Sequence, residues 1–297
     1  MVQVAPDWIA VDWGTSRLRV WAMQGATARE QRQSEDGLTG LTPDAFEPAL
    51  LRLAGDWIGP DGMDIVACGM VGARQGWHEV PYVAVPTAPP VAAAVRSPAI
   101  DTRVRLWIVP GMKQASPPDV MRGEETQIAG FLALNKGWDG VICLPGTHTK
   151  WVHVSAGEVV SFQTALTGEL FALLARHSTL RHSIAETGWD EDAFAAALDQ
   201  ARSRPERLAA ALFALRADDL LNGCPPDTAR ARLSGLLIGA DLAASRAYWL
   251  GQQVAVIGAS ETAAPYVRAL QLQGVPATVA DGDRMTLAGL TAAHRAL

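Results

Sequence analysis

The sequence predicts an α/β protein with two similar halves, and three observations predict it. Runs of β-branched and aromatic residues alternate with segments whose apolar residues recur every three or four positions. Two strand-turn-strand units, at 8–23 and 140–155, carry small or hydroxyl-bearing residues in their turns. A chain of 297 residues is also long enough for about two domains.

The first half is expected to be rich in strands. Four apolar runs bounded by turn residues predict strands at 8–13, 18–23, 64–69 and 104–111, with helices between some of them. Segment 84–103 is rich in proline and alanine, so it is expected to be an irregular loop over the surface.

A second set of strands opens the second half, and a helix-rich stretch follows it. Strands are expected at 140–146, 150–155, 158–164, 253–260 and 275–281. Apolar residues at i, i+3 and i+4 predict helices at 124–136, 168–180, 191–201, 205–217, 230–250, 261–273 and 284–296.

Charge and composition exclude some classes of partner. The net charge of -6 argues against nucleic acid and anionic membranes, because binding to both depends on basic residues. No stretch reaches the roughly 18 apolar residues of a membrane span. The first residues lack a basic region followed by a long apolar run, so we expect a cytoplasmic protein. Cys68, Cys143 and Cys224 are widely spaced and are expected to be structural thiols.

The two turns share a chemistry that suits phosphate. The first follows Asp12 and reads Gly14-Thr15-Ser16, and the second contains Gly146, Thr147 and Thr149. Backbone donors and hydroxyls with little side-chain bulk allow a turn to wrap phosphate oxygens closely. Alternatively, such hydroxyls stabilise the turn itself through hydrogen bonds to the backbone. Two equivalent turns, one opening each half, favour a nucleotide held between two domains.

Other phosphate and nucleophile motifs are missing from the sequence. Lys150 is followed by Trp151, so no GxxxxGK[ST] loop exists, and no GxGxxG follows a strand. Ser260 is not in a GxSxG elbow, and the histidines do not form HExxH. The paired turns therefore carry the functional prediction.

Several strings resemble a known family. The DWGTS turn, PGTHTK and the Gly258-Ala259-Ser260 element resemble the phosphate-1, phosphate-2 and adenosine motifs of the actin, sugar kinase and Hsp70 superfamily. Within it, the chain resembles the 2-dehydro-3-deoxygalactonokinase family from about residue 8 to 290. The strings that carry this second resemblance are GMVGARQGW, VPGMK, MRGEETQIAG, LPGTHTKWV and TALTGELFALLARHSTL.

The resemblance implies a fold and an activity. The fold is a two-domain actin-like ATPase (ribonuclease H-like) fold with a central cleft, divided into 1–118 and 119–297. The first domain would hold the phosphate-1 hairpin and the substrate loops, and the second the phosphate-2 hairpin and the adenosine element. The activity is ATP-dependent phosphorylation of 2-dehydro-3-deoxy-D-galactonate to its 6-phosphate, with Mg²⁺. Alternatives are another sugar or sugar-acid kinase, or a non-catalytic actin-like sugar sensor; a homo-oligomer stays open.

The resemblance also implies nucleotide-binding residues. Asp12 would position Mg²⁺ through water, which makes it a metal-binding and catalytic residue. Arg17 contacts phosphate or lies on a solvated face, whereas Arg19 is expected to be solvated. The remaining nucleotide-binding residues are Gly14, Thr15, Ser16, Gly146, Thr147, His148, Thr149, Lys150, Gly258, Ala259 and Ser260.

The general base is expected in MRGEETQIAG. Related carbohydrate kinases carry an Asp after a Gly at the start of the corresponding helix, and this chain has Glu124 and Glu125 after Gly123. Carboxylates at a helix N-terminus are also favoured by the helix dipole, which is a purely structural explanation. Glu124 is the first choice because it directly follows Gly123.

A sugar acid needs a cation for its carboxylate. Arg74 suits this role because a guanidinium binds a carboxylate through two parallel hydrogen bonds. Gln75 and Trp77 are expected to contact hydroxyls and the carbon chain, although Trp77 would equally serve to pack the loop. Arg122 is the next candidate, whereas Thr167-Gly168-Glu169 is explained by a helix start.

Overall fold

The computed structural model describes residues 6–297, and backbone contacts divide them into two units. Unit 1 contains the chain up to Asp139 together with Val154–Ser161 and Gly282–Leu297, and unit 2 contains Gly140–His153 and Phe162–Asp281. Residues 119–139 and the C-terminal helix therefore cluster with the first unit, because these two segments pack against each other. The domain boundary at 118/119 stays a prediction.

Unit 1 is built on a six-stranded mixed sheet. Strands β1 and β2 form an antiparallel hairpin that pairs Asp12 with Arg19, and β3 continues it. Strands β1, β4 and β7 are parallel, and β6 is antiparallel to β7. In the order of the sheet the strands are β3 (Thr27–Ser34), β2 (Leu18–Gln24), β1 (Trp8–Trp13), β4 (Met63–Gly69), β7 (Val104–Ile108) and β6 (Val95–Ser97).

Alternating side chains of β1 fill two cores, because successive strand residues point to opposite faces. Val11 and Trp13 pack with helix α1 (Phe46–Ala54) on one face. Trp8 and Ala10 pack with helix α9 (Gly282–Arg295) on the other. The strand is thus buried on both sides, which holds Asp12 at a rigid strand end.

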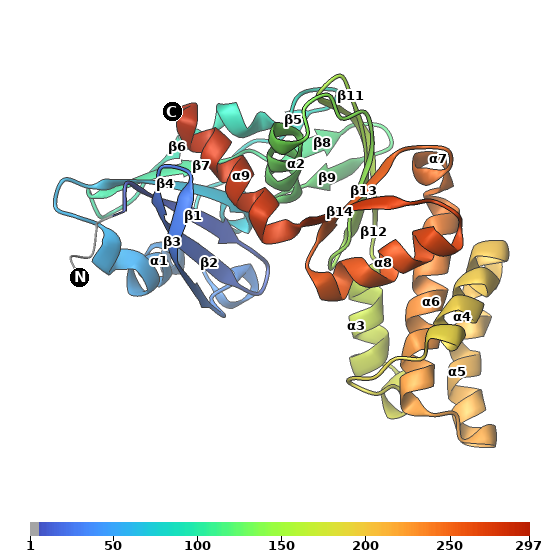
Figure 1. Ribbon diagram of the computed structural model, residues 1–297. Helices are drawn as coiled ribbons and strands as arrows, with labels where there is room; N and C mark the ends of the chain where they lie inside the picture. Colours follow the sequence, from blue (N-terminus) through green and yellow to red (C-terminus); the bar gives the residue numbers. More distant parts are fainter. Residues whose placement is uncertain (1–5) are drawn as a thin grey trace. The chain divides into compact units, whose positions relative to one another are not determined.

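Helix α9 lies beside α2 (Glu124–Leu134), as Figure 1 shows. A Cβ on Gly130 would lie 1.9 Å from the carbonyl oxygen of Met285, and one on Gly289 would lie 2.0 Å from that of Thr126. Glycine is required at both positions, because any side chain would push the two helices apart. This close crossing fixes the start of α2 relative to the start of α9.

Several elements of unit 1 differ from the sequence prediction. The segment expected to be irregular contains β6 and part of β5 (Val83–Ala84), which pairs in a small sheet with β8 (Met112–Gln114) and β9 (Asp119–Met121). Strand β3 was not expected, because it is a largely exposed polar strand without an apolar period.

Unit 2 has a helical subdomain and most of a five-stranded mixed sheet (Figure 1), of which only Val154–Ser161 cluster with unit 1. In order, the strands are β12 (Glu158–Ala165), β11 (Thr149–Ser155), β10 (Gly140–Leu144), β13 (Val254–Gly258) and β14 (Ala277–Asp281). The helices are α3 (Thr167–His177), α4 (Glu191–Ser203), α5 (Leu208–Asn222), α6 (Pro226–Ala244), α7 (Arg246–Trp249) and α8 (Ser260–Leu272).

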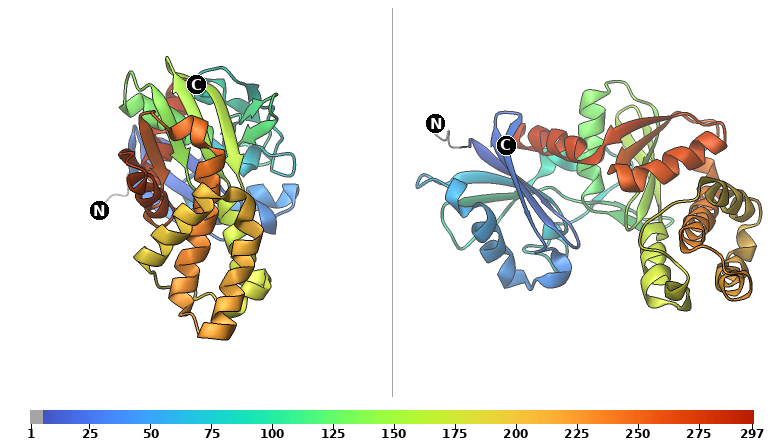
Figure 2. Two further views of the ribbon diagram at one scale, coloured as in Figure 1. Left: turned by 90° about the vertical axis from the view of Figure 1, so that its right-hand side faces the viewer. Right: turned by 60° about the horizontal axis from the view of Figure 1, so that its bottom comes forward.

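Helices α4 and α6 pack closely, as both views of Figure 2 show. A Cβ on Gly235 would lie 2.5 Å from the carbonyl oxygen of Phe194, and one on Gly239 would lie 2.4 Å from that of Leu198. The helix expected at 230–250 begins earlier, at Pro226, since proline is favoured in the first turn. Its C-terminal part is the separate short helix α7.

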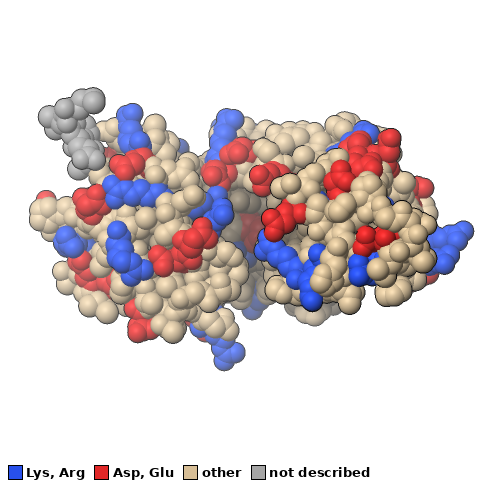
Figure 3. Space-filling view, turned by 90° about the horizontal axis from the view of Figure 1, so that it is seen from below, with Lys and Arg blue, Asp and Glu red and all other residues tan. Residues whose placement is uncertain are grey.

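The surface and the thiols agree with the composition. On the face drawn in Figure 3, basic and acidic side chains are intermingled over both units. Within residues 6–297, no helix is both long and apolar enough to cross a bilayer. Cys68, Cys143 and Cys224 are buried free thiols, as expected of structural residues.

Candidate functional site

Asp12 lies at the carboxyl end of β1 and is held by Arg19. Arg19 donates hydrogen bonds to both Asp12 and Asp283, the second residue of α9. Burial raises the pKa of the Asp12 carboxyl, and the charge of Arg19 offsets part of that rise. The expectation that Arg19 is merely solvated was wrong, because the hairpin register places it directly opposite Asp12.

The first turn is held by backbone hydrogen bonds. The Gly14 N–H donates to the Arg17 carbonyl oxygen at 2.8 Å, and the Thr39 N–H donates to that of Thr15 at 3.0 Å. The side chains of Thr15, Ser16 and Arg17 are exposed, and Arg17 lies 3.4 Å from the exposed Glu35 carboxylate. The turn thus keeps a fixed backbone while its side chains stay accessible.

Gly69 brings the start of α2 close to Asp12. It is the last residue of β4 and has a φ of 86°, and a Cβ there would lie 2.5 Å from the Trp13 carbonyl oxygen and 3.4 Å from Asp12 Oδ1. A Cβ on Gly123 would lie 3.4 Å from Gly69 Cα. Two adjacent glycines therefore allow the helix with the predicted base to begin beside the predicted metal ligand.

The two glutamates at the start of α2 differ in environment. Glu125 is fully buried and accepts hydrogen bonds from the Gly123 N–H at 2.7 Å and from Thr126 Oγ1 at 3.0 Å. Burial, together with the charge of Glu124, raises the pKa of Glu125 to about 8. Glu124 is partly exposed and accepts from the Arg122 N–H at 3.0 Å. Only Glu124 is accessible to a substrate hydroxyl without movement of the chain.

The predicted substrate residues also lie in unit 1. Arg74 and Gln75 are exposed, whereas Trp77 is partly buried against the core and meets Trp13 edge to face, with ring centroids 6.3 Å apart. Arg122 donates from Nη2 to the Val80 carbonyl oxygen at 2.8 Å, and its Nε and Nη1 are buried. Arg74 is therefore the accessible guanidinium, and Trp77 packs its loop.

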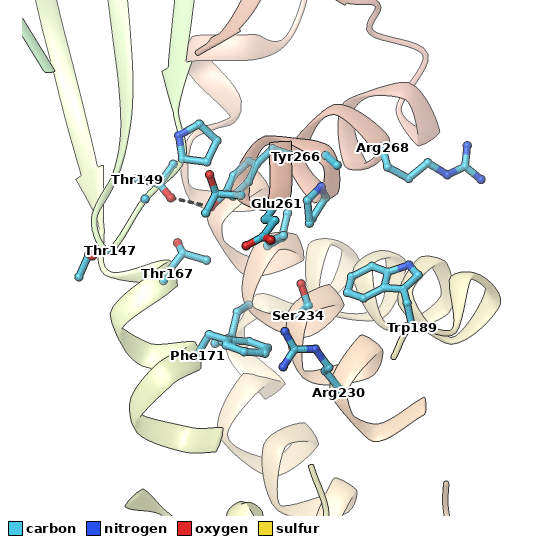
Figure 4. A pocket seen from close by; sticks show the side chains of 18 of the residues that line it. Thr147, Thr149, Thr167, Phe171, Trp189, Arg230, Ser234, Glu261, Tyr266 and Arg268 are labelled. Carbon is cyan, nitrogen blue, oxygen red and sulfur yellow. Dashed lines mark hydrogen bonds between the residues drawn. The ribbon is translucent and has the colours of Figure 1, made fainter. Parts of the chain in front are cut away.

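Unit 2 contains a pocket of about 1130 Å³. Residues of the second turn, Gly146, Thr147 and Thr149, line one wall, and α8 contributes another (Figure 4). Lys150 follows Thr149 on β11 and is buried outside this lining, because adjacent strand residues face opposite ways. The volume of the pocket lies slightly above the roughly 300–1,000 Å³ typical of small-molecule sites, so it is large enough for a nucleotide.

The N-terminus of α3 packs against the second turn. The Glu169 N–H donates to the Thr147 carbonyl oxygen at 2.8 Å, and a Cβ on Gly168 would lie 2.1 Å from the Gly146 carbonyl oxygen. His148 pairs with Glu169 at 2.7 Å. The Glu169 N–H is therefore already paired, and it is the positive end of the α3 dipole that favours an anion at this wall of the pocket.

The predicted adenosine element lies next to the lining rather than in it. Gly258 ends β13, and a Cβ there would lie 3.4 Å from Thr262 Oγ1 and 3.6 Å from the Pro145 carbonyl oxygen, both on lining residues. Ala259 is the N-cap of α8, and Ser260 is its first residue. A larger side chain at Gly258 would therefore extend toward the pocket.

Sequence reasoning missed several lining residues. Trp189, Arg230, Phe171 and Glu261 all line the pocket, and the Arg230 guanidinium lies 5.1 Å from the centroid of the Phe171 ring. Trp189 precedes α4 in a loop, so no periodicity could have indicated it. The sequence gives a weak indication of Arg230, since it lies one helical turn before Ser234, which also lines the pocket.

The carboxylates around Arg19 suit Mg²⁺. In the described part of the chain no cluster of three or more His, Cys, Asp or Glu side chains is placed to hold a metal. Asp12 and Asp283 bond to different nitrogens of Arg19, so the second oxygen of each carboxylate is the donor left for a metal. Mg²⁺ typically binds one or two carboxylates and otherwise keeps waters and substrate phosphates, so this donor set fits it.

Comparisons with known proteins identify a family. The family model 2-keto-3-deoxy-galactonokinase matches residues 12–293. The chain is 39% identical to the "probable 2-dehydro-3-deoxygalactonokinase" of Rhizobium meliloti (strain 1021), over 97% of this chain and 96% of that protein. It is 35% identical to the 2-dehydro-3-deoxygalactonokinase of Escherichia coli (strain K12), over 95% and 96%.

Solved structures agree with this relationship. A crystal structure of a "putative 2-dehydro-3-deoxygalactonokinase protein" from Sinorhizobium meliloti matches with a TM-score of 0.90 and 37% identity, over 97% of this chain and 98% of that one. The activator of the 2-hydroxyisocaproyl-CoA dehydratase from Clostridium difficile matches at 0.52 and 10% identity, over 97% and 95%. The predicted actin-like ATPase fold is confirmed.

Proposed function

Because the chain belongs to the 2-keto-3-deoxy-galactonokinase family, it is a sugar-acid kinase, and we propose that it phosphorylates 2-dehydro-3-deoxy-D-galactonate with ATP. The γ-phosphate goes to the terminal hydroxyl, which gives the 6-phosphate. The observation that carries this proposal is the family match over nearly the whole chain, together with a nucleotide-sized pocket beside the second turn.

ATP occupies the pocket of unit 2 in this proposal. The phosphates lie at Gly146 and Thr147, where the α3 N-terminus favours negative charge. The base lies toward Trp189 and the Arg230–Phe171 pair, because flat aromatic and guanidinium groups stack on a purine. Glu261 on α8 is a carboxylate acceptor for ribose hydroxyls (Figure 4).

Asp12 and Asp283 would hold Mg²⁺, which neutralises charge on the β- and γ-phosphates when bound. Arg19 keeps both carboxylates in place through its two hydrogen bonds. Thr15 and Ser16 offer hydroxyl donors to the terminal phosphate from a turn whose backbone is fixed.

Glu124 is the proposed general base. As the terminal hydroxyl oxygen bonds to the γ-phosphorus, its proton passes to the Glu124 carboxylate and the bond from that phosphorus to the bridging oxygen of ADP breaks. Glu125 cannot receive this proton as readily, because it is fully buried and a pKa of about 8 keeps it largely protonated near neutral pH. Arg74 binds the substrate carboxylate, and Gln75 binds hydroxyls.

The proposed function is tested by coupled ADP release with a panel of substrates. The panel contains 2-dehydro-3-deoxy-D-galactonate, its stereoisomers, other ketodeoxy acids and common aldoses. We expect the highest kcat/KM for the galactonate derivative and little turnover with aldoses, which lack the carboxylate. Preference for an aldose would contradict the proposed substrate. An equal rate of ADP release with and without every sugar in the panel would contradict kinase activity. A cytoplasmic location is part of the same proposal, because the reaction consumes ATP.

A further inference from the structure

A buried carboxylate in unit 2 is held by neutral donors. Asp241 on α6 is 4% exposed. It accepts hydrogen bonds from Trp151 Nε1 at 3.0 Å, from Thr167 Oγ1 at 2.9 Å and from the Tyr266 hydroxyl. Among residues 6–297, only these neutral donors, and no lysine or arginine, offset the burial of its charge. Burying a carboxylate without a basic partner costs free energy. Three hydrogen bonds offset that cost here, and they do so only while the three donors keep their present positions.

The donors belong to three elements that surround the pocket. Trp151 is on β11, Thr167 begins α3, and Tyr266 is on α8. Tyr266 also bonds to Thr149 Oγ1 at 2.9 Å, the contact drawn as a dashed line in Figure 4. Thr149, Thr167 and Tyr266 line the pocket, whereas Asp241 lies behind it. One carboxylate thus connects the second turn to both neighbouring helices.

The network also determines which hydroxyl donates in each hydrogen bond. Tyr266 has a single hydroxyl proton and donates it to Asp241, so Thr149 must donate its own proton to Tyr266. Thr167 likewise donates its proton to Asp241. Both threonines therefore direct their hydroxyl protons into the network, so neither hydroxyl donates to a ligand in the pocket. Phosphate oxygens are left to the backbone N–H groups.

We propose that Asp241 is a positioning residue for the nucleotide, acting through Thr167 and through Tyr266 and Thr149 on the walls of the pocket. The inference rests on the proposed function, in which ATP occupies this pocket. Asp241 fixes the spacing of the second turn from α8 and holds the first residue of α3 beside it. It contacts neither ATP nor the sugar acid itself.

Two variants test the network with little change in packing. Tyr266→Phe keeps the ring and removes the hydroxyl that connects Asp241 to Thr149. Asp241→Asn keeps the shape, because its amide nitrogen can donate to the Tyr266 and Thr167 oxygens while its oxygen still accepts from Trp151. The two hydrogen bonds are then reversed in direction and lose the assistance of the carboxylate charge, so they hold α8 and the start of α3 less tightly.

The matched control is Ser245→Ala. Ser245 is fully buried one helical turn after Asp241, and its hydroxyl donates to the Asp241 backbone carbonyl at 2.8 Å. It lies outside the pocket lining. This variant therefore loses a buried hydrogen bond on the same helix without touching the proposed connection.

Steady-state kinetics and ATP binding by calorimetry give the readouts. We expect Tyr266→Phe and Asp241→Asn each to raise the KM and Kd for ATP about fivefold to tenfold, with the KM for the sugar acid unchanged. The double variant should be little worse than either single one, because both act through one network. Ser245→Ala should lower only the melting temperature.

The inference is overturned if Tyr266→Phe and Asp241→Asn lower the melting temperature but keep wild-type KM and Kd for ATP, as the control does. If Asp241→Asn does not fold, the KM and Kd for ATP of Tyr266→Phe, compared with those of Ser245→Ala, test the inference. A wild-type protein that fails to bind ATP overturns the proposed function and the inference together. Normal wild-type binding with unaffected variants overturns the inference alone.

Discussion

Replacing the buried Glu125 by Gln should stabilise the protein increasingly as the pH rises. The folded-state pKa is raised from 4.5 to about 8, mainly by burial. Between these pH values the folded chain keeps a proton that the unfolded chain releases, so wild-type stability falls as the pH rises. The loss is absent below about pH 4.5 and complete above about pH 8, where it reaches at most about 5 kcal/mol.

The Gln variant removes this titration while keeping the local hydrogen bonds. Its side-chain oxygen can accept from the Gly123 N–H, and its amide can donate to Thr126 Oγ1. Denaturant unfolding of both proteins at pH 5 and pH 8.5 measures the effect. We expect a small difference in the free energy of unfolding at pH 5 and a variant more stable by several kcal/mol at pH 8.5.

A control and a contrary result complete the test. Glu124→Gln removes the neighbouring charge that contributes to the raised pKa of Glu125. The pH range over which stability falls should therefore become narrower but not disappear. If Glu125→Gln differs from wild type by the same free energy at both pH values, Glu125 is not held as a buried acid and the reasoning fails. Activity separates the two residues further, because Glu124→Gln should abolish turnover.

Four more perturbations follow from the site. Asp12→Ala should lower kcat about a hundredfold or more while ATP affinity falls less; near-normal turnover in a coupled assay would remove it from the mechanism. Arg74→Ala should raise the KM for the sugar acid about tenfold to a hundredfold, and unchanged preference for the acid over its reduced alcohol analogue would disprove the assignment. Gly258→Leu should weaken ATP binding by calorimetry, whereas Gly258→Ala should not, since its Cβ would be 3.4 Å from the nearest atom. Gly289→Ala should destabilise unit 1 by about 1–3 kcal/mol in denaturant unfolding, because the new Cβ would lie 2.0 Å from a carbonyl oxygen of α2; wild-type stability would show that the helices can separate freely.

The sequence predicted those parts of the fold that follow from local periodicity. The hairpin of β1 and β2 was expected within one residue at its ends, because its apolar runs are bounded by a clear turn. Strand β3 escaped prediction because its residues are mostly polar and its stability comes from pairing with β2. Helix α9 was expected at nearly its true bounds, but its place against β1 depends on long-range packing that no local pattern shows.

In the candidate site too, residues of a local motif were predicted, whereas residues brought together by long-range packing were not. Gly146, Thr147 and Thr149 were predicted from a turn motif, and they line the pocket. Asp283 could not be predicted beside Asp12, because they lie 271 positions apart and only the β1–α9 packing brings them to Arg19. Asp241 lies within an apolar helix segment, where a lone acid gives no indication of its partners.

The central claim, transfer of phosphate to the terminal hydroxyl of the sugar acid, is tested most directly by ³¹P NMR of the reaction mixture with ATP, Mg²⁺ and 2-dehydro-3-deoxy-D-galactonate. We expect ADP to appear together with a phosphomonoester whose phosphorus couples to the two protons of the terminal carbon, which gives a triplet. A doublet would place the phosphate on a CH carbon and contradict the site of transfer. Inorganic phosphate alone, or unchanged ATP, would contradict the kinase itself.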